Sequence, residues 1–228
     1  MIRGAVAAVA VAAGLCGLAA SASAQMFGLS NIQNWTGTGS NQAALVIDWN
    51  DGKGPESIAW GFRWNGTATG LDMFRAIDLA DPRLALFPGT DPTFGTFVYG
   101  IGYDLNGNGG TFTPGTPRSN ETGGASDPGD HYAEGFFSKY WAYYNSDTGS
   151  PYGGGGAWAF GDNGAAGRTL VNGSWDGYSI SDANFDASNP GFPSPAAVPE
   201  PAAGLRLACG AVAACLAWRR KGFNRARV

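Results

Sequence analysis

The stretch IAWGFRWNGTATGLDMFRAIDLADP, residues 58–82, decides the fold class of this chain. In its first part a large apolar residue stands at every second position, with small or charged residues between. Side chains of a strand alternate between the two faces of a sheet, so this pattern predicts a strand with one apolar face. The apolar residues are Ile58, Trp60, Phe62 and Trp64, and Asn65-Gly66 then predicts a turn.

The second part of the stretch predicts a helix. Thr69, followed three residues later by Asp72, has the form of a capping box, in which each residue satisfies a free backbone amide of the other. Pro82 ends the helix because proline cannot continue the backbone hydrogen bonding. Between these limits lies a helically spaced apolar stripe, which we interpret as core, formed by Leu71, Met73, Phe74, Ile77 and Ala80.

Further strands are expected on both sides of this stretch, where apolar runs are bounded by Gly, Asn and Asp. They cover residues 43–49, 97–103 and 139–144, the segment around Trp158 and Phe160, and a last pair, 170–171 and 175–180, joined at Asn172-Gly173. Many strands with one early helix predict an α+β fold. We expect a single β-rich domain over residues 25–187, with a mixed sheet covered by one main helix.

Composition limits what this domain can bind. Between residues 25 and 198 there are 14 Asp and 3 Glu against 2 Lys and 5 Arg, a net charge of −10. Such a surface repels nucleic acid, so no nucleic-acid partner is expected. The three cysteines, Cys16, Cys209 and Cys215, all lie in the two terminal apolar segments. Disulfides are therefore not expected to stabilise the domain.

A Gly-rich and Asn-rich loop over residues 104–130 contains one metal-binding pattern. Asp104, Asn106 and Asn108 alternate as in the opening of a Ca²⁺ loop, where oxygens at alternate positions converge. The twelfth position is Gly115, so the usual bidentate Glu is missing. An ordinary Asn-Gly turn also explains the pattern, because Asp, Asn and Gly favour turns by themselves. We expect no cofactor, with Ca²⁺ as the alternative.

Aromatic side chains on the later strands are candidates for ligand binding. Trp141, Tyr143, Tyr144 and Trp175 could stack on sugar rings, because aromatic faces offer contact area at low entropic cost. Alternating aromatics are also typical of a half-buried strand, and we favour that interpretation, core packing, for these four.

No catalytic constellation stands out, and we expect a protein that is not an enzyme. His131 is the only histidine, which argues against a His-rich zinc site. No Gly-x-Ser-x-Gly elbow accompanies it to supply a nucleophile. A pair of carboxylates suffices for glycoside hydrolysis, but the spacing singles out no pair.

Several short motifs carry a resemblance that spans about half the chain. They are Thr69-Gly70-Leu71-Asp72, Tyr140-Trp141-Ala142-Tyr143-Tyr144, Gly164-Ala165 and Asn172-Gly173-Ser174-Trp175-Asp176-Gly177. Their order resembles small β-grasp-like domains of exported proteins, including the C-terminal domain of cobalamin-carrier proteins. The resemblance implies a β-grasp-like arrangement, and a cobalamin-type ligand as one alternative, although a fold does not fix a function.

The first 24 residues read as a secretory signal peptide. A short basic start with Arg3 precedes an apolar run over residues 5–20, and small residues follow up to Ala24. This order is that of a segment cleaved by signal peptidase. We expect cleavage after Ala24 and export of the domain, rather than retention by an uncleaved anchor.

The C-terminal region has three parts. A Pro-rich segment, predicted to be a linker over residues 188–197, leads into Val198, Pro199, Glu200 and Pro201. An apolar segment over residues 202–218 is long enough for a marginal transmembrane helix, and basic residues after it would stay in the cytoplasm. These basic residues begin with Arg219, Arg220 and Lys221.

This tripartite tail resembles the PEP-CTERM sorting signal. The resemblance implies recognition by an exosortase, an integral-membrane protease that cuts near the motif, in Gram-negative bacteria that make extracellular polysaccharide. Arg206 interrupts the apolar segment, where a charge is costly unless it reaches the membrane interface. An ordinary anchor without processing remains the alternative.

Together these features predict an exported protein of the cell envelope or extracellular matrix, sorted by an exosortase and held only transiently in the inner membrane by its C-terminal helix. We expect a non-catalytic surface role, with extracellular polysaccharide as a partner in the alternative. That alternative is a glycan-binding or small-ligand-binding module displayed at the cell surface.

Overall fold

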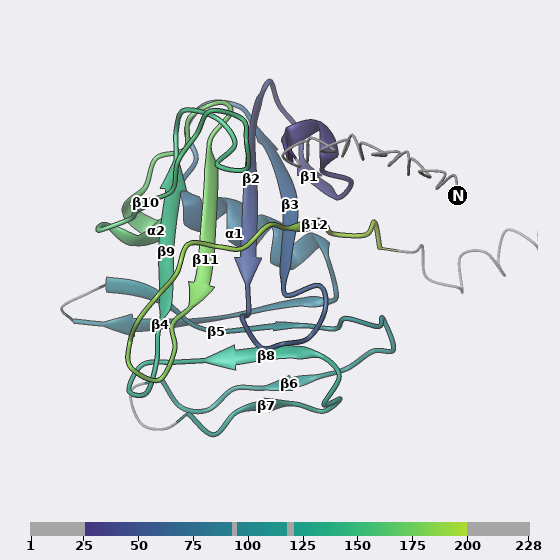
Figure 1. Cartoon of the computed structure of the whole chain (residues 1–228), viewed down its shortest axis with the longest axis vertical. Helices are drawn as coiled ribbons and strands as arrows, with labels where there is room; N and C mark the ends of the chain where they lie inside the picture. The colour runs from purple at the N-terminus through teal and green to yellow at the C-terminus, as the bar shows by residue number, and fades with distance from the viewer. Residues whose placement is uncertain (1–25, 93–94, 118–120, 200–228) are drawn as a thin grey trace, which may run out of the picture.

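The computed structural model describes residues 26–92, 95–117 and 121–199, which fold around one large sheet (Figure 1). In this main sheet the strand order is β1-β3-β2-β11-β9-β10, and β12 pairs with β3 outside this path. Its strands are β1 (Trp35–Gly37), β2 (Asn41–Asp48), β3 (Ser57–Trp64), β9 (Trp141–Ser146), β10 (Ala159–Phe160), β11 (Trp175–Ile180) and β12 (Ser194–Pro195). The short 3-10 helix η1 (Leu29–Asn31) precedes β1.

The main sheet is mixed, as the sequence predicts. β2 pairs antiparallel with β3 but parallel with β11, and β11 pairs antiparallel with β9. The parallel pairing of β2 and β11 joins segments about 130 residues apart, with Ala44 opposite Trp175. A parallel pair requires a long crossover between its strands, and here that crossover contains most of the domain.

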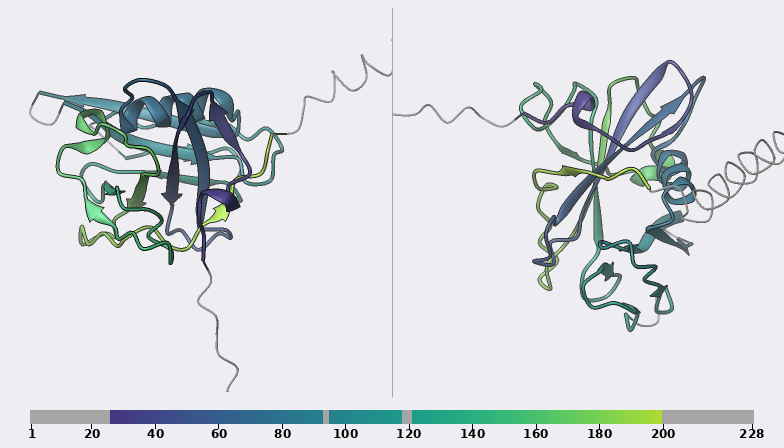
Figure 2. Two further views of the ribbon diagram at one scale, coloured as in Figure 1. Left: turned by 90° about the horizontal axis from the view of Figure 1, so that it is seen from above. Right: turned by 90° about the vertical axis from the view of Figure 1, so that its right-hand side faces the viewer.

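Both faces of the main sheet are covered. Along β2, Ala43, Leu45 and Ile47 pack into a cluster with the helix, whereas Ala44 and Val46 pack into a second cluster on the opposite face. The sequence predicts an apolar face on one side of the strand 58–64 only. The segments that cover the other side, around Phe27 and Trp158, show no regular hydrophobic period and gave no signal. Figure 2 places the main helix on one side of the sheet and the purple N-terminal segment on the other.

A second, smaller sheet lies across the lower end of the main one (Figure 1). It has the order β4-β5-β8, formed by β4 (Leu84–Asp91), β5 (Gly95–Tyr103) and β8 (His131–Glu134). The two-stranded ribbon of β6 (Phe112–Thr113) and β7 (Gly124–Ala125) extends from the loop between β5 and β8. The predicted long loop therefore contains a small ribbon of its own.

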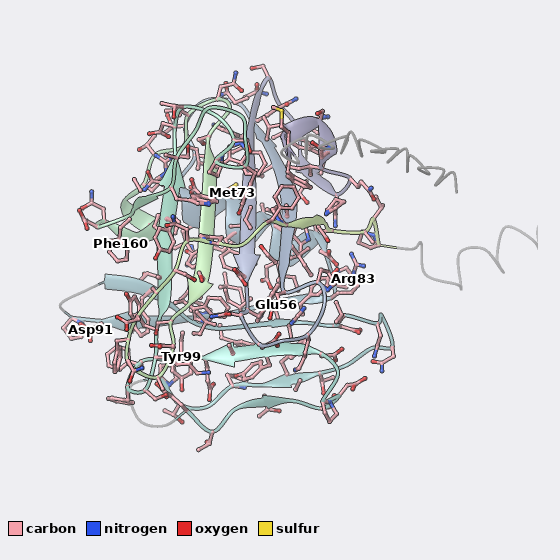
Figure 3. The ribbon with its side chains drawn as sticks, viewed as in Figure 1. Glu56, Met73, Arg83, Asp91, Tyr99 and Phe160 are labelled. Atoms are coloured by element: carbon pink, nitrogen blue, oxygen red, sulfur yellow. The ribbon has the colours of Figure 1, made fainter. Side chains whose placement is uncertain are left out.

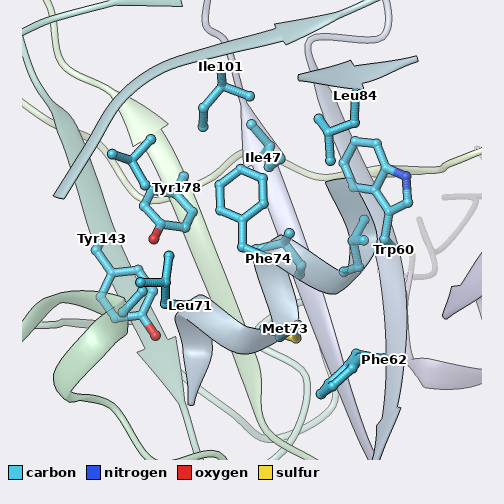
Figure 4. Packing of buried hydrophobic residues seen from close by; sticks show 14 of the residues in the cluster. Ile47, Trp60, Phe62, Leu71, Met73, Phe74, Leu84, Ile101, Tyr143 and Tyr178 are labelled. Atoms are coloured by element: carbon cyan, nitrogen blue, oxygen red, sulfur yellow. The ribbon is translucent and has the colours of Figure 1, made fainter. Parts of the chain in front are cut away.

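The main helix, α1 (Gly70–Ala80), begins and ends as predicted. The Thr69 hydroxyl accepts a hydrogen bond from the Asp72 amide at 3.1 Å, and the Asp72 carboxylate accepts one from the Thr69 amide at 2.9 Å, which is the capping box. Its apolar face fills the space between the sheets, where Figure 4 shows Leu71, Met73 and Phe74 against strand side chains. A second helix, α2 (Gly164–Gly167), has one turn.

Part of the predicted Pro-rich linker over residues 188–197 packs on the domain. Ser194 and Pro195 form β12, which runs parallel to β3, and the Ala196 amide donates to the Ala59 carbonyl at 2.8 Å. Pro190 and Ala196 are buried. A strand at the edge of a sheet tolerates proline, because its outward amides need no partner. A Pro-rich segment can therefore form a strand that composition does not predict.

Turn predictions succeed only in part. Asn172-Gly173 does turn the chain into β11, with Gly173 at a φ of +88°, but residues 170–171 form no strand. Asn65-Gly66 turns β3 toward α1 instead of into a hairpin, and the Asn65 side chain accepts from the Ser40 amide at 3.1 Å. The described residues are β-rich, with a mixed sheet and few helices, as the sequence predicts.

Candidate ligand groove and acidic loop

The four aromatic residues proposed for ligand binding are all buried. Trp175, only 1% exposed, packs edge-on against Phe27 and Tyr152 on the face of the sheet opposite α1. Trp141 donates its indole N–H to the Ala133 carbonyl at 3.3 Å. They therefore do not form an exposed stacking platform, and core packing accounts for them.

Two of these residues nevertheless form the floor of a groove of about 390 Å³ beside β9. Trp141 and Tyr143 line it together with Tyr140, Phe160 and Asn163. A polar depression of about 330 Å³ adjoins this groove, and the two share the segment 161–164, which contains Asp162. Asn145, Arg168 and Thr169 also line the depression. Trp175 and Tyr144 do not line the groove. Tyr144 contacts Phe160, which does.

Phe160 is the exposed aromatic at this groove, with 53% of its surface accessible (Figure 3). Its ring stands edge-on to Tyr144 at 5.7 Å between centroids. The next residue, Gly161, lies against Tyr143 so closely that a Cβ there would be 2.4 Å from the ring. Glycine is thus required where the loop forms the wall of the groove.

A buried polar network supports the groove from below. Asp176 accepts a hydrogen bond from the Tyr143 hydroxyl at Oδ2, and Arg168 Nε lies 3.1 Å from Oδ1. Arg168 also pairs with Asp147. Burial raises the pKa of Asp176 to about 6, against the opposing effects of Arg168 and Tyr143. Burial likewise raises the pKa of Tyr143, as does the neighbouring Asp176.

This network connects several elements of the fold. A Cβ at Gly70, the first residue of α1, would lie 2.5 Å from Asp176 Oδ2 and 2.6 Å from the Tyr143 hydroxyl, so the helix begins directly on the network. Both Asp176 oxygens have protein partners. No sequence period marks this network, and its signal in the sequence is a charged residue, Asp176, within the predicted strand 175–180.

The predicted Ca²⁺-loop residues form a tight turn after β5. The Asp104 carboxylate accepts from the amides of Gly107 at 2.7 Å, Asn108 at 3.2 Å and Gly109 at 2.8 Å. Asn106 Oδ1 accepts from the Asn108 amide at 2.9 Å. The expected turn is present, and Gly109, with a φ of +87°, stands where a Ca²⁺ loop has its glycine.

The structure brings two carboxylates to this turn, Asp127 and Asp130, which no local sequence pattern connects with Asp104. Asp127 Oδ2 accepts from the side-chain amides of Asn106 at 2.9 Å and Asn108 at 2.7 Å. Asp130 Oδ1 accepts from the Leu105 amide at 3.0 Å. Both carboxylates lie in the segment before β8, and the pairing of β8 with β5 returns this segment to Asp104.

His131 has a structural role in this region. It is fully buried and stacks on Trp49 with ring centroids 4.6 Å apart. Nδ1 lies 3.1 Å from both oxygens of Asp51, and Nε2 lies 3.0 Å from the Pro55 carbonyl. Each ring nitrogen thus faces an acceptor oxygen and fixes the loop between β2 and β3.

The predicted sorting motif, residues 198–201, begins where the described residues end. The Ala197 carbonyl accepts from Asn34 Nδ2 at 3.3 Å and from Arg83, whereas Val198 is 63% exposed. Pro199 is half-buried. Glu200, Pro201, the apolar segment 202–218, the basic residues Arg219, Arg220 and Lys221, and the predicted signal peptide lie outside the described residues. Within residues 26–92, 95–117 and 121–199, no helix has the length and apolar character to cross a bilayer.

Comparisons with protein families, curated proteins and solved structures found no match to this chain.

Proposed function

We propose that this chain is an exported protein of the cell envelope or extracellular matrix, sorted by an exosortase-type membrane protease. The observation that carries the proposal is the order of the tail: Val-Pro-Glu-Pro at residues 198–201, an apolar segment, then basic residues. A signal peptide at the opposite end agrees with it. The role proposed for the domain itself is non-catalytic.

The position of the motif supports this proposal. Residues 194–197 are fixed to the domain by β12 and by the contacts of Arg83 and Asn34 with Ala197, and Val198 then leaves the surface. A protease cutting near the motif would release the whole domain without removing any of its packed residues. Such a cut would leave the core intact.

Mapping both termini of the native protein by mass spectrometry tests the proposal, using separated membrane and extracellular fractions. We expect an N-terminus at Gln25 and a C-terminus within residues 198–201. Replacing residues 198–201 by alanine should leave the C-terminal segment in place and keep the protein in the membrane fraction. The matched control replaces the exposed Ser188 and Asn189 by alanine, which should not alter processing.

A C-terminus at Val228 in all the membrane-bound protein would contradict sorting and indicate a simple anchor. Identical processing of the wild type and the motif variant would contradict recognition of the motif.

A second function, binding of a glycan by the groove beside β9, is favoured by one observation. Phe160 is exposed next to amide and carboxylate side chains, Asn145, Asp162 and Asn163, which together offer a stacking face and hydrogen-bonding groups. This site replaces the four buried aromatics as the candidate. The β-grasp-like resemblance, with a corrinoid as its ligand, stays a prediction. A corrinoid included among the ligands in the binding experiment below would test it.

We expect fragments of envelope polysaccharide to bind in the groove, and calorimetry measures this binding. Phe160→Ala should weaken binding about five-fold or more, since stacking on an aromatic face contributes about 1 kcal/mol or more when desolvated. Phe137→Ala is the matched control, because Phe137 is 52% exposed and does not line the groove. Equal binding by both variants, or none by the wild type, would exclude this site.

A further inference from the structure

The turn after β5 meets the backbone requirements of a Ca²⁺-binding loop. Counting Asp104 as the first position, Asn106 and Asn108 occupy the third and fifth, where such loops place oxygen ligands. The sixth position is Gly109, with a φ of +87°, which satisfies the glycine requirement of the sharp turn. The sequence alone leaves this loop without a strong ligand at its twelfth position.

Asp130 supplies the missing carboxylate from another segment. It is 0% exposed, and its Oδ1 is held by the Leu105 amide, yet its Oδ2 has no hydrogen-bond partner among the described residues. A buried carboxylate oxygen without a partner is costly, and native structures normally provide one. This atom therefore requires an explanation.

The free oxygen points into the loop. A Cβ placed on Gly110, the seventh position, would lie 2.1 Å from Asp130 Oδ2 and 3.6 Å from Asn108 Oδ1. Only glycine leaves room for the carboxylate at this point. In a Ca²⁺ loop the seventh position contributes its main-chain carbonyl, so Asp130 Oδ2 approaches the loop where a cation would lie.

Charge at this place favours a cation. Three carboxylates gather at the turn: Asp104 forms it, Asp127 accepts from the side-chain amides of Asn106 and Asn108, and Asp130 accepts from the Leu105 amide. Lys53 contributes one positive charge, but its ammonium donates to the main-chain carbonyl of Asp130 and pairs with Asp51 at 3.5 Å. Three carboxylates against one ammonium leave an excess of negative charge.

The donor set selects the kind of ion. Within the described residues, His, Cys, Asp and Glu side chains alone form no group of three that could hold a metal ion. Side-chain amide and main-chain oxygens must therefore complete the shell. Mixed carboxylate, amide and carbonyl oxygens suit Ca²⁺, which takes six to eight oxygen ligands in flexible geometry, whereas Zn²⁺ prefers His and Cys.

We propose that Asp104, Asn106, Asn108, Asp130 and the Gly110 carbonyl bind Ca²⁺, and that Asp127, which lies against the side chains of Asn106 and Asn108, adds negative charge beside the ion. Binding requires the amides of Asn106 and Asn108, which now donate to Asp127, to turn their oxygens toward the ion. The ion connects the loop after β5 with the start of β8 and so stabilises the second sheet. This proposal does not depend on the sorting proposal.

Calcium titration of the full chain, purified in mild detergent and stripped with EDTA, tests the site. Affinity should fall in the range of extracellular modules, about 10⁻⁴ to 10⁻³ M. At about 10 mM CaCl₂ the midpoint of thermal unfolding should then rise by about 3–10 °C, and an equal concentration of MgCl₂ should raise it less.

Asp130→Asn separates ion binding from a structural role. It should weaken Ca²⁺ binding at least ten-fold in calorimetry, while in EDTA the variant should unfold at the same or a higher temperature than the wild type. Asp127→Asn, at a half-buried position, should weaken binding without affecting the core. The control is Asp182→Asn, because Asp182 accepts from the amides of Asn184 and Asp186 in a similar turn without a buried carboxylate.

Three results would each overturn the proposal. The first is the absence of both binding heat and a shift of the unfolding midpoint in 10 mM CaCl₂ (about ten times the weakest expected dissociation constant). The second is an equal response to MgCl₂. The third is an Asp130→Asn variant that responds to Ca²⁺ as the wild type does.

Discussion

Asp176 is the residue on which several parts of the domain converge. It lies on β11, accepts a hydrogen bond from Tyr143 on β9, pairs with Arg168 after α2, and contacts the first residue of α1. Partners on both oxygens offset part of the cost of burying this carboxylate. The residue therefore sets the relative placement of two helices and two strands.

The raised pKa of Asp176 gives a pH dependence with a defined sign. Because the folded pKa, about 6, lies above the ordinary value of 3.8, the folded state binds this proton more tightly than the unfolded state does. The resulting stabilisation is complete below about pH 4 and is lost as the pH rises through about 6. At neutral pH the carboxylate is ionised at the expense of stability.

We therefore expect the free energy of unfolding of the wild type, relative to Asp176→Asn, to fall by roughly 2 kcal/mol between pH 4 and pH 7, at about 1.4 kcal/mol per pKa unit. Urea unfolding across this range measures it. Tyr143→Phe should move the transition to higher pH, because it removes a donor that favours the charged form. A difference that stays constant with pH would contradict the assignment.

At the scale of elements, the strands that the sequence pattern does not predict either contain proline or lack alternating apolar and polar residues. β4 contains Pro88 at a bulge against β5, and it lies at the edge of its sheet, where the absence of an amide donor is tolerated. β8 has only four residues, beginning with the buried His131. Pairing with β5 makes both segments strands.

β12 is the element with the clearest consequence for the boundary of the domain. Ala196→Asp should destabilise the protein by about 3 kcal/mol or more, because Ala196 is buried and the new carboxylate would have no partner. Ala197→Asp is the control, since Ala197 is exposed, and it should change stability by no more than about 0.5 kcal/mol. Urea unfolding of both variants measures the difference. Equal effects would argue against a packed β12.

At the scale of the whole molecule, burial on both faces of the main sheet explains the high aromatic content. Trp49 and Trp60 lie in or beside the α1 cluster, whereas Phe27, Tyr152 and Trp175 form the opposite one. Aromatic pairs contribute about 0.5–1.5 kcal/mol beyond the area that they bury. Two aromatic cores thus stabilise a domain without cysteine.

The candidate sites were predictable to different degrees. The Ca²⁺-loop pattern at Asp104, Asn106 and Asn108 follows from local spacing, and so does the turn that it forms. Asp127 and Asp130 are 19 residues or more from this triplet, and no sequence period connects them. Phe160 gave no signal as a ligand residue, because exposure is a property of the folded surface.

The sequence by itself determined what depends on neighbouring residues: the strand at residues 58–64, the helix that begins at Thr69, the turn at Asn172-Gly173 and the tail pattern of residues 198–221. Only the tertiary structure decided the parallel pairing of β2 with β11, the burial of the four candidate aromatics and the approach of Asp130 to Gly110. These features arise when distant segments pack to remove apolar surface from water, and the energy of that packing depends on contacts that local patterns do not encode.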